Sequence, residues 1–221
     1  MRTLYHFSLC PFSRKVRISL HEKRLEFNLS EEKVWERRPE FAKLNPALQV
    51  PVLQESDGFA LPEQQAITEY LEEAYPDIQL IPGTTKERAE IRRICSWFDN
   101  KFYHEVSRYQ LKEKVIRYHT GGAPSTEVLR ACKQNIATHL DYIAFLTENQ
   151  RYLAGDSFTL ADITAAAHLS MVDFLGGINW RFHPQAKEWY ALIKSRPSFR
   201  PLLTDKVKGF TAPAHYSNPD F

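Results

Sequence analysis

The chain changes its local pattern near residue 85, and this change limits the possible fold more than any other feature of the sequence. Strand-forming residues with apolar alternation occur before residue 62, whereas helical spacings of three and four dominate after Lys86. The stretch 76–85 between them contains Pro82-Gly83, a pair typical of a linker. The sequence therefore predicts an α/β domain over 1–78, an all-helical domain over 86–203 and a C-terminal tail over 204–221.

The first domain has the element order of a thioredoxin-like fold. Its patterns predict a strand, a helix, a strand, a hairpin and a helix, over residues 3–7, 11–23, 25–29, 50–53 with 59–61, and up to 75. Pro11 suits the first turn of the first helix, because that position needs no N–H donor. We expect the charged residues of this helix to form a mostly solvated face: Arg14, Lys15, Arg17, Glu22, Lys23 and Arg24.

Two features organise the helical domain. A stripe of residues spaced by three and four predicts one buried helix face, to which Cys132 belongs as a packing residue: Leu129, Cys132, Ile136, Leu140 and Ile143. Thr159 and Asp162 have the spacing of a capping box, in which a hydroxyl and a carboxylate satisfy the first amides of a helix. The helix that follows is mostly apolar, so we expect it at the centre of this domain.

Composition excludes several classes of function. The net charge of +2 and the lack of a dense Lys/Arg block argue against binding to nucleic acid. Neither an apolar N-terminal signal region nor a bilayer-spanning stretch is present, so we expect a cytoplasmic chain without membrane insertion. The three cysteines, at positions 10, 95 and 132, form neither a disulfide framework nor a metal-spaced cluster, and we expect no bound metal.

The segment around Val50-Pro51 and Glu63-Gln64, together with the Thr159 to Asp162 box, resembles the glutathione S-transferase family. In that family a strand begins at a cis-proline whose preceding backbone pairs with the cysteinyl part of glutathione. An acid and a serine at the next helix start bind the γ-glutamyl end. Here the resemblance assigns these roles to Val50, Pro51, Glu63 and Gln64. Because glutamine is longer than serine, we expect weak or absent glutathione binding.

Cys10 and Ser8 are the candidate catalytic residues. Cys10 precedes Pro11 at a helix start, where the helix dipole and free amides can lower a thiol pKa. The resemblance implies thiol exchange with glutathione for a cysteine here, or stabilisation of the glutathione thiolate by a serine such as Ser8. In the alternative interpretation, Cys10 is a small packing residue and Ser8 a local hydrogen-bond partner.

Three surfaces are candidates for binding a partner. Trp35 lies among charged residues, as an interface anchor does, although it also suits a position over the glutathione pocket or under its own loop. The helix from Lys86 to about Tyr118 has nine basic and five acidic residues, including Arg92 and Arg93, and suits an acidic partner, a dimer contact or a plain solvated face. The tail has aromatic and charged residues that suggest docking on the body or on a partner: Tyr216, Asp220 and Phe221.

Within the family, the segments 35–40, 194–203 and 214–221 resemble a bacterial subgroup of cell-division proteins that bind FtsZ. This resemblance implies a homodimeric, non-catalytic protein that organises FtsZ filaments at the division site, with no cofactor. Cys10 fits this interpretation least well. The competing hypothesis is an active glutathione S-transferase, or a glutathione-dependent thiol transferase, that uses Cys10 or Ser8 with glutathione.

Overall fold

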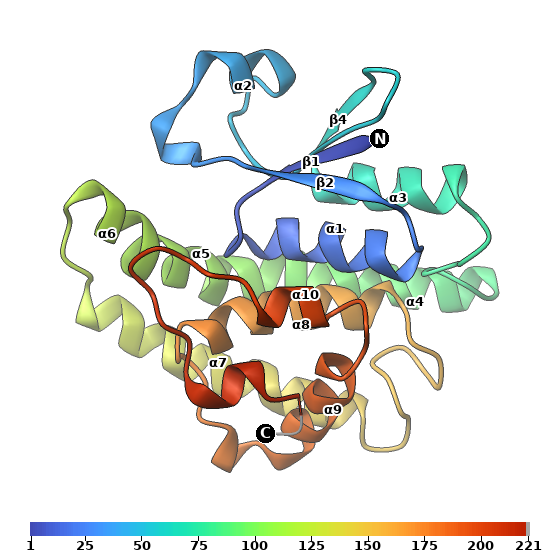
Figure 1. Ribbon diagram of the computed structural model, residues 1–221. Helices are drawn as coiled ribbons and strands as arrows, with labels where there is room; N and C mark the ends of the chain where they lie inside the picture. Colours follow the sequence, from blue (N-terminus) through green and yellow to red (C-terminus); the bar gives the residue numbers. More distant parts are fainter. Residues whose placement is uncertain (220–221) are drawn as a thin grey trace.

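The computed structural model describes residues 1–219, and the N-terminal part is built on a four-stranded sheet. The strands are β1 (Arg2–His6), β2 (Phe27–Glu31), β3 (Val52–Gln54) and β4 (Ala60–Pro62). Their spatial order is β2-β1-β3-β4, in which β1 pairs with β2 in parallel and the other pairs are antiparallel. This mixed sheet is the predicted thioredoxin-like arrangement (Figure 1).

Two helices, α1 (Pro11–Glu22) and α3 (Gln64–Ala74), pack against one face of the sheet, and α2 (Pro39–Leu44) lies on the other side (Figure 1). Leu4, Leu20 and Ile67 contribute to the core between the sheet and these helices. Strand β2 begins two residues later than predicted. Arg24 adopts a left-handed conformation with φ of 56°, and the Leu25 amide still donates a hydrogen bond to the Leu20 carbonyl. These residues therefore terminate α1 and are not free to pair in the sheet.

One long helical rod begins the second half of the chain and extends from Thr85 to Thr120. It consists of α4 (Thr85–Ser96), α5 (Arg108–Gln110) and α6 (Arg117–Thr120), joined by π-helical stretches over Trp97–Ser107 and Leu111–Ile116. A capping box between Thr84 and Glu87 starts the rod. Gly121 ends it in a left-handed conformation with φ of 79°, which glycine adopts without steric penalty.

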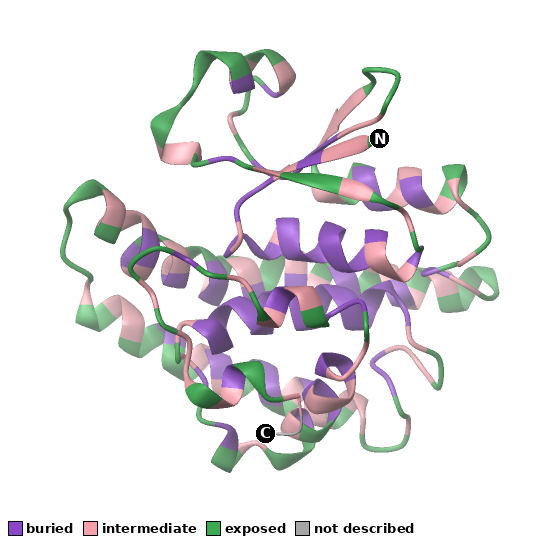
Figure 2. Cartoon of the chain, viewed as in Figure 1, coloured by how far each residue is buried: buried purple, intermediate pink, exposed green. Residues whose placement is uncertain are grey.

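The remaining helices pack around a buried centre, as predicted. They are α7 (Thr126–Leu146), α8 (Leu160–Phe174), α9 (Pro184–Lys194) and α10 (Arg200–Leu203), with short 3-10 helices at Val34–Glu36, Trp180–Phe182 and Ala214–Ser217. Every residue of α8 is buried, and the Thr159 and Asp162 capping box is present. Figure 2 shows α1 and α8 as the most completely buried helices, and they pack against each other.

The prediction of a solvated charged face on α1 was wrong. Arg14, Lys15 and Arg17 are 0%, 1% and 2% exposed, because α1 is covered by the sheet on one side and by α8 on the other. Distant carboxylates compensate these charges. The Lys15 ammonium lies 2.6 Å from Asp99, and the Arg17 guanidinium donates two hydrogen bonds of 2.7 and 2.9 Å to Asp205.

The tail docks on the body of the protein over its described residues, up to 219. Val207 and Tyr216 are buried, and the Tyr216 hydroxyl accepts a 2.8 Å hydrogen bond from Arg14. The prediction that Tyr216 contacts a partner is therefore corrected, because its side chain is 1% exposed and lies in the core. Asp220 and Phe221, predicted for the same role, lie outside the described residues.

Candidate functional site

A pocket of about 610 Å³ brings together the four residues to which the sequence assigned glutathione contacts. Val50, Pro51, Glu63 and Gln64 all line it, and the Val50-Pro51 peptide bond is cis. The opposite wall comes from α1 and from the helical rod, so the pocket lies between the two halves of the chain: Phe12, Asp99, Asn100, Tyr103 and His104. This volume falls within the usual range for a small-molecule site.

The wall at the start of α3 has the geometry of an anion site. Glu63 precedes the helix with φ of 78° and ψ of 119°, a conformation that costs a non-glycine residue about 1–3 kcal/mol and that is common in ligand clamps. The Glu63 side chain makes no capping hydrogen bond, so the first amides of α3 remain available to an acidic group. Gln64 is the first residue of α3 and is half-buried, so its carboxamide lies beside the predicted anion site at the helix start.

Cys10 lies behind the pocket rather than on its surface. The residue is 8% exposed, and its thiol donates a 3.7 Å hydrogen bond to the Val50 carbonyl. Burial raises the pKa of the Cys10 thiol, and this outweighs the lowering effect of the Ser13 and Phe12 amides at the helix start. This shift is opposite to the one expected from the dipole alone. Ser8 is half-buried, and its carbonyl accepts a 2.7 Å hydrogen bond from Arg14.

Sequence reasoning did not identify the helical wall of the pocket. Tyr103 packs on Phe12 with ring centroids 4.7 Å apart, and Asp99 is held by Lys15 at 2.6 Å and by His168 at 3.3 Å. The Lys15 cation opposes the effect of burial and keeps the pKa of Asp99 below its ordinary value. The helical spacing of 99, 100, 103 and 104 marks one helix face, but nothing in the sequence indicates that this face meets the strand at Val50.

Trp35 is fixed against both halves of the chain. Its ring meets Phe7 edge to face at 5.3 Å and stacks on His119 at 4.8 Å with an interplanar angle of 10°. The indole is half-buried, and its neighbours Lys33, Glu36 and Arg37 are exposed. Trp35 does not line the predicted glutathione pocket, so this aromatic residue holds the β2–α2 connection against α6.

Arg92 and Arg93 lie far from Trp35. Arg92 makes two 2.8 Å hydrogen bonds to Glu69, and Arg93 pairs with Glu90 and with the Tyr142 hydroxyl. Both precede His119 along the rod, Arg92 by 27 residues and Arg93 by 26. Figure 1 shows α4 and α6 at opposite ends of the rod. The predicted partner-binding residues therefore do not form one continuous patch.

Within residues 1–219, no group of three or more His, Cys, Asp or Glu side chains is arranged to hold a metal ion. In the same described range, no helix has both the length and the apolar character needed to cross a membrane. Cys10, Cys95 and Cys132 are free and buried.

A thioredoxin-like domain with a cis-proline at its pocket, a strained acid at the next helix start and a following helical domain define the glutathione transferase class of folds. Residues 4–79 match the glutathione S-transferase N-terminal domain, and residues 126–192 match the glutathione S-transferase C-terminal domain. The chain belongs to the glutathione S-transferase family.

Similar proteins match the chain from end to end. FtsZ-localized protein A of Caulobacter vibrioides is 43% identical over 224 residues, which cover all of this chain and 98% of that protein. The crystal structure of a glutathione S-transferase from Rhodospirillum rubrum F11 is 50% identical, with a TM-score of 0.98 and complete coverage of both chains. The structure of FzlA from C. crescentus is 43% identical with a TM-score of 0.96, covering 100% of this chain and 99% of that one.

Replacing Gln64 with serine tests whether the pocket is otherwise competent. We expect Gln64→Ser to raise the affinity for reduced glutathione about tenfold, because a short hydroxyl leaves room for the γ-glutamyl carboxylate and donates to it. Isothermal titration calorimetry measures the change. Gln65→Ser is the matched control, since Gln65 is the adjacent exposed residue of the same pocket. Low-micromolar binding by the unmodified chain would show that Gln64 does not obstruct the ligand.

Proposed function

We propose that this protein binds FtsZ filaments and organises them at the division site, as a cytoplasmic homodimer with weak or no glutathione binding. The observation that supports this most strongly is the end-to-end match at 43% identity to FtsZ-localized protein A. The match covers all of this chain and 98% of that protein, so it includes the tail and the Trp35 connection of this chain.

Trp35 is the anchor that we propose for this interaction. The indole is already held by Phe7 and His119, so binding a partner needs little further ordering of the side chain. Half-buried aromatic residues within a polar rim are frequent interface hot spots, and Lys33, Glu36 and Arg37 supply such a rim. Arg92 and Arg93 are already paired and lie at the other end of the rod, so we assign them a secondary role.

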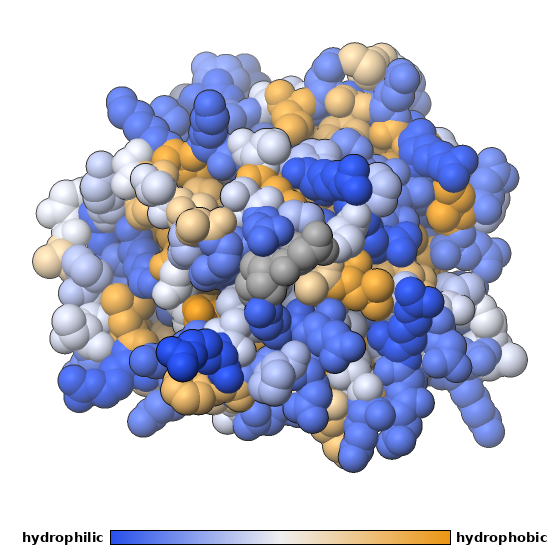
Figure 3. Space-filling model, turned by 60° about the horizontal axis from the view of Figure 1, so that its bottom comes forward, coloured by the Kyte–Doolittle hydropathy of each residue, from blue (hydrophilic) through white to orange (hydrophobic). Residues whose placement is uncertain are grey.

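The exposed apolar residues are dispersed over the chain. Among the described residues, the large hydrophobic residues that are exposed are Met1, Leu29, Phe59, Tyr118, Phe145 and Phe182. The face in Figure 3 has separate apolar patches among hydrophilic residues rather than one continuous apolar area. This surface therefore suits an interface built on one anchored aromatic residue among charged residues better than an interface built on a broad hydrophobic patch.

Co-sedimentation with assembled FtsZ filaments tests the proposal. We expect the unmodified chain to pellet with the filaments, and Trp35→Ala to weaken binding at least about tenfold, because the truncation removes the anchor of the interface. Trp35→Phe should retain part of the binding, since a ring can still stack on His119.

Phe182→Ala is the matched control for this experiment. Phe182 is 75% exposed on a short 3-10 helix, and the ring contacts of Trp35 are with Phe7 and His119 rather than with Phe182. We expect this variant to pellet like the unmodified chain. If the unmodified chain stays in the supernatant, the chain does not bind FtsZ filaments and the proposal is wrong.

The second candidate function is that of a glutathione S-transferase or glutathione-dependent thiol transferase. It is supported by the Rhodospirillum rubrum protein, which is named a glutathione S-transferase, and by the location of Cys10 next to the Val50 carbonyl. The buried thiol with its raised pKa weakens the role of Cys10 as a nucleophile. Glutathione-dependent turnover that is lost in Cys10→Ala or Ser8→Ala would favour this function.

A further inference from the structure

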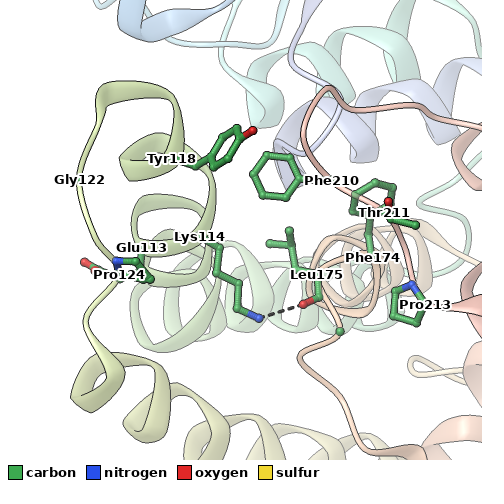
Figure 4. A pocket seen from close by; sticks show the side chains of 11 residues that line it. Glu113, Lys114, Tyr118, Gly122, Pro124, Phe174, Leu175, Phe210, Thr211 and Pro213 are labelled. Carbon is green, nitrogen blue, oxygen red and sulfur yellow. Dashed lines mark hydrogen bonds between the residues drawn. The ribbon is translucent and has the colours of Figure 1, made fainter.

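A second cavity of about 400 Å³ lies between the distal part of the rod, the end of α8 and the tail (Figure 4). It shares no lining residue with the glutathione pocket. Lys114 on its wall follows His104 of that pocket by 10 residues along the rod. This cavity is therefore a separate site and does not depend on the function proposed above.

Three aromatic rings contribute to the walls of the cavity. Tyr118 and Phe210 meet edge to face with ring centroids 5.1 Å apart, and Phe174 contributes a third ring from α8. Figure 4 shows the Phe210 and Tyr118 rings on one side of the space and Lys114 extending beneath them. Such walls favour a flat apolar body, because aromatic rings pack on one another in offset and edge-to-face arrangements.

Lys114 places a positive charge at the base of this apolar space. Its ammonium donates a 2.9 Å hydrogen bond to the Leu175 carbonyl, which leaves two further donors. Among residues 1–219 no carboxylate pairs with it, since the adjacent Glu113 is engaged by Arg117 and by the Ser125 amide. Burial lowers the pKa of Lys114, so a nearby anion would restore the charged form.

We propose that this cavity binds a small aromatic carboxylate, with the ring system between Tyr118, Phe174 and Phe210 and the carboxylate on the Lys114 ammonium. The ligand carboxylate pairs with the Lys114 ammonium, which no carboxylate within residues 1–219 does, because Glu113 of the same cavity is engaged by Arg117 and by the Ser125 amide. A charge-assisted hydrogen bond then replaces the solvation that the half-buried ammonium has lost. The apolar walls exclude strongly hydrated anions such as free phosphate, so the carboxylate must come with an apolar body.

Calorimetric titration of the full chain with 2-naphthoate and with its neutral isostere 2-naphthamide tests the proposal. We expect the carboxylate to bind about tenfold more tightly than the amide, because only the carboxylate pairs with the ammonium. In Lys114→Met, which keeps the aliphatic length, the two affinities should become equal. Lys112→Met is the matched control, since Lys112 is exposed on the same rod and does not line the cavity; it should keep the tenfold preference.

Two further variants make the result decisive. Thr211→Trp places a ring in the cavity and leaves Lys114 unchanged, so it should weaken both probes. If Lys114→Met does not fold, Lys114→Gln replaces it with the same expectation. The proposal is overturned if 2-naphthoate does not bind the unmodified chain at millimolar concentration, if acid and amide bind equally, or if the preference survives loss of the Lys114 charge.

Discussion

Asp205→Asn is expected to lower the free energy of unfolding by about 3–5 kcal/mol, because it leaves two buried guanidinium ions without a carboxylate. Asp205 accepts both hydrogen bonds from Arg17 and lies 3.6 Å from Arg14, and the two arginine side chains are 2% and 0% exposed. The other bonds of Arg14 go to neutral groups, on Ser8, Ser170 and Tyr216, which do not balance its charge. For a chain of this size we expect a loss of roughly 10 °C in Tm.

Thermal unfolding followed by circular dichroism measures this effect, with Asp77→Asn as the control. Asp77 is exposed and has the same side chain, so its neutralisation should change the Tm by no more than about 2 °C. If Asp205→Asn also changes the Tm of the unmodified chain by no more than about 2 °C, the buried arginines are solvated or paired in another way. The ion pairs of Arg14 and Arg17 with Asp205 would then not stabilise the fold as we infer.

Asp162→Ala is expected to destabilise the protein by about 3–5 kcal/mol. The Asp162 carboxylate is 0% exposed and accepts hydrogen bonds from the Leu153 amide, the Trp189 indole and the Thr159 amide, at 2.9, 3.0 and 3.0 Å. Alanine leaves these buried donors unsatisfied, at about 1–3 kcal/mol each before the site relaxes. Urea unfolding measures the change, which should appear as a lower transition midpoint with an unaltered slope.

The chain supplies its own matched control for this prediction. Thr84 and Glu87 form a second capping box with the same reciprocal hydrogen bonds, but this one is exposed to solvent. We expect Glu87→Ala to cost no more than about 1 kcal/mol, because water satisfies the freed amide. Equal losses in Asp162→Ala and Glu87→Ala would show that the capping motif, and not its burial, determines the effect.

The parts of the fold that could be predicted from the sequence depend on local rules. Pro11 marks the first turn of α1, and Thr159 with Asp162 marks the start of α8, because each places a particular group where the helix end needs it. The stripe through Cys132 and Ile136 is buried on α7, as its spacing predicts. Boundaries such as the start of β2 were less accurate, since the turn at Arg24 depends on how α1 ends.

The candidate site was predictable only in part. The residues on the strand and helix of one domain, Val50 and Glu63 among them, do converge on a pocket. The opposite wall with Tyr103 and the raised pKa of Cys10 depend on how the helical rod and α1 pack together. Sequence places Trp35 among charged neighbours but does not reveal the stacking on His119, which comes from a residue 84 positions later.

The sequence by itself determined the thioredoxin-like order of strands and helices and the capped central helix, because these depend on periodicity and on residues close together in the chain. The family followed from the resemblance of the segments around Val50-Pro51 and Glu63-Gln64 and of the Thr159 to Asp162 box, and the two domain matches confirm it. Only the tertiary structure decided which charges are buried. Arg14 and Arg17 have the spacing of a surface face, yet α8 covers them and Asp205, 188 residues after Arg17, neutralises them. The spacing of residues along a helix predicts which of them share a face. It does not predict which other elements pack against that face and bury it.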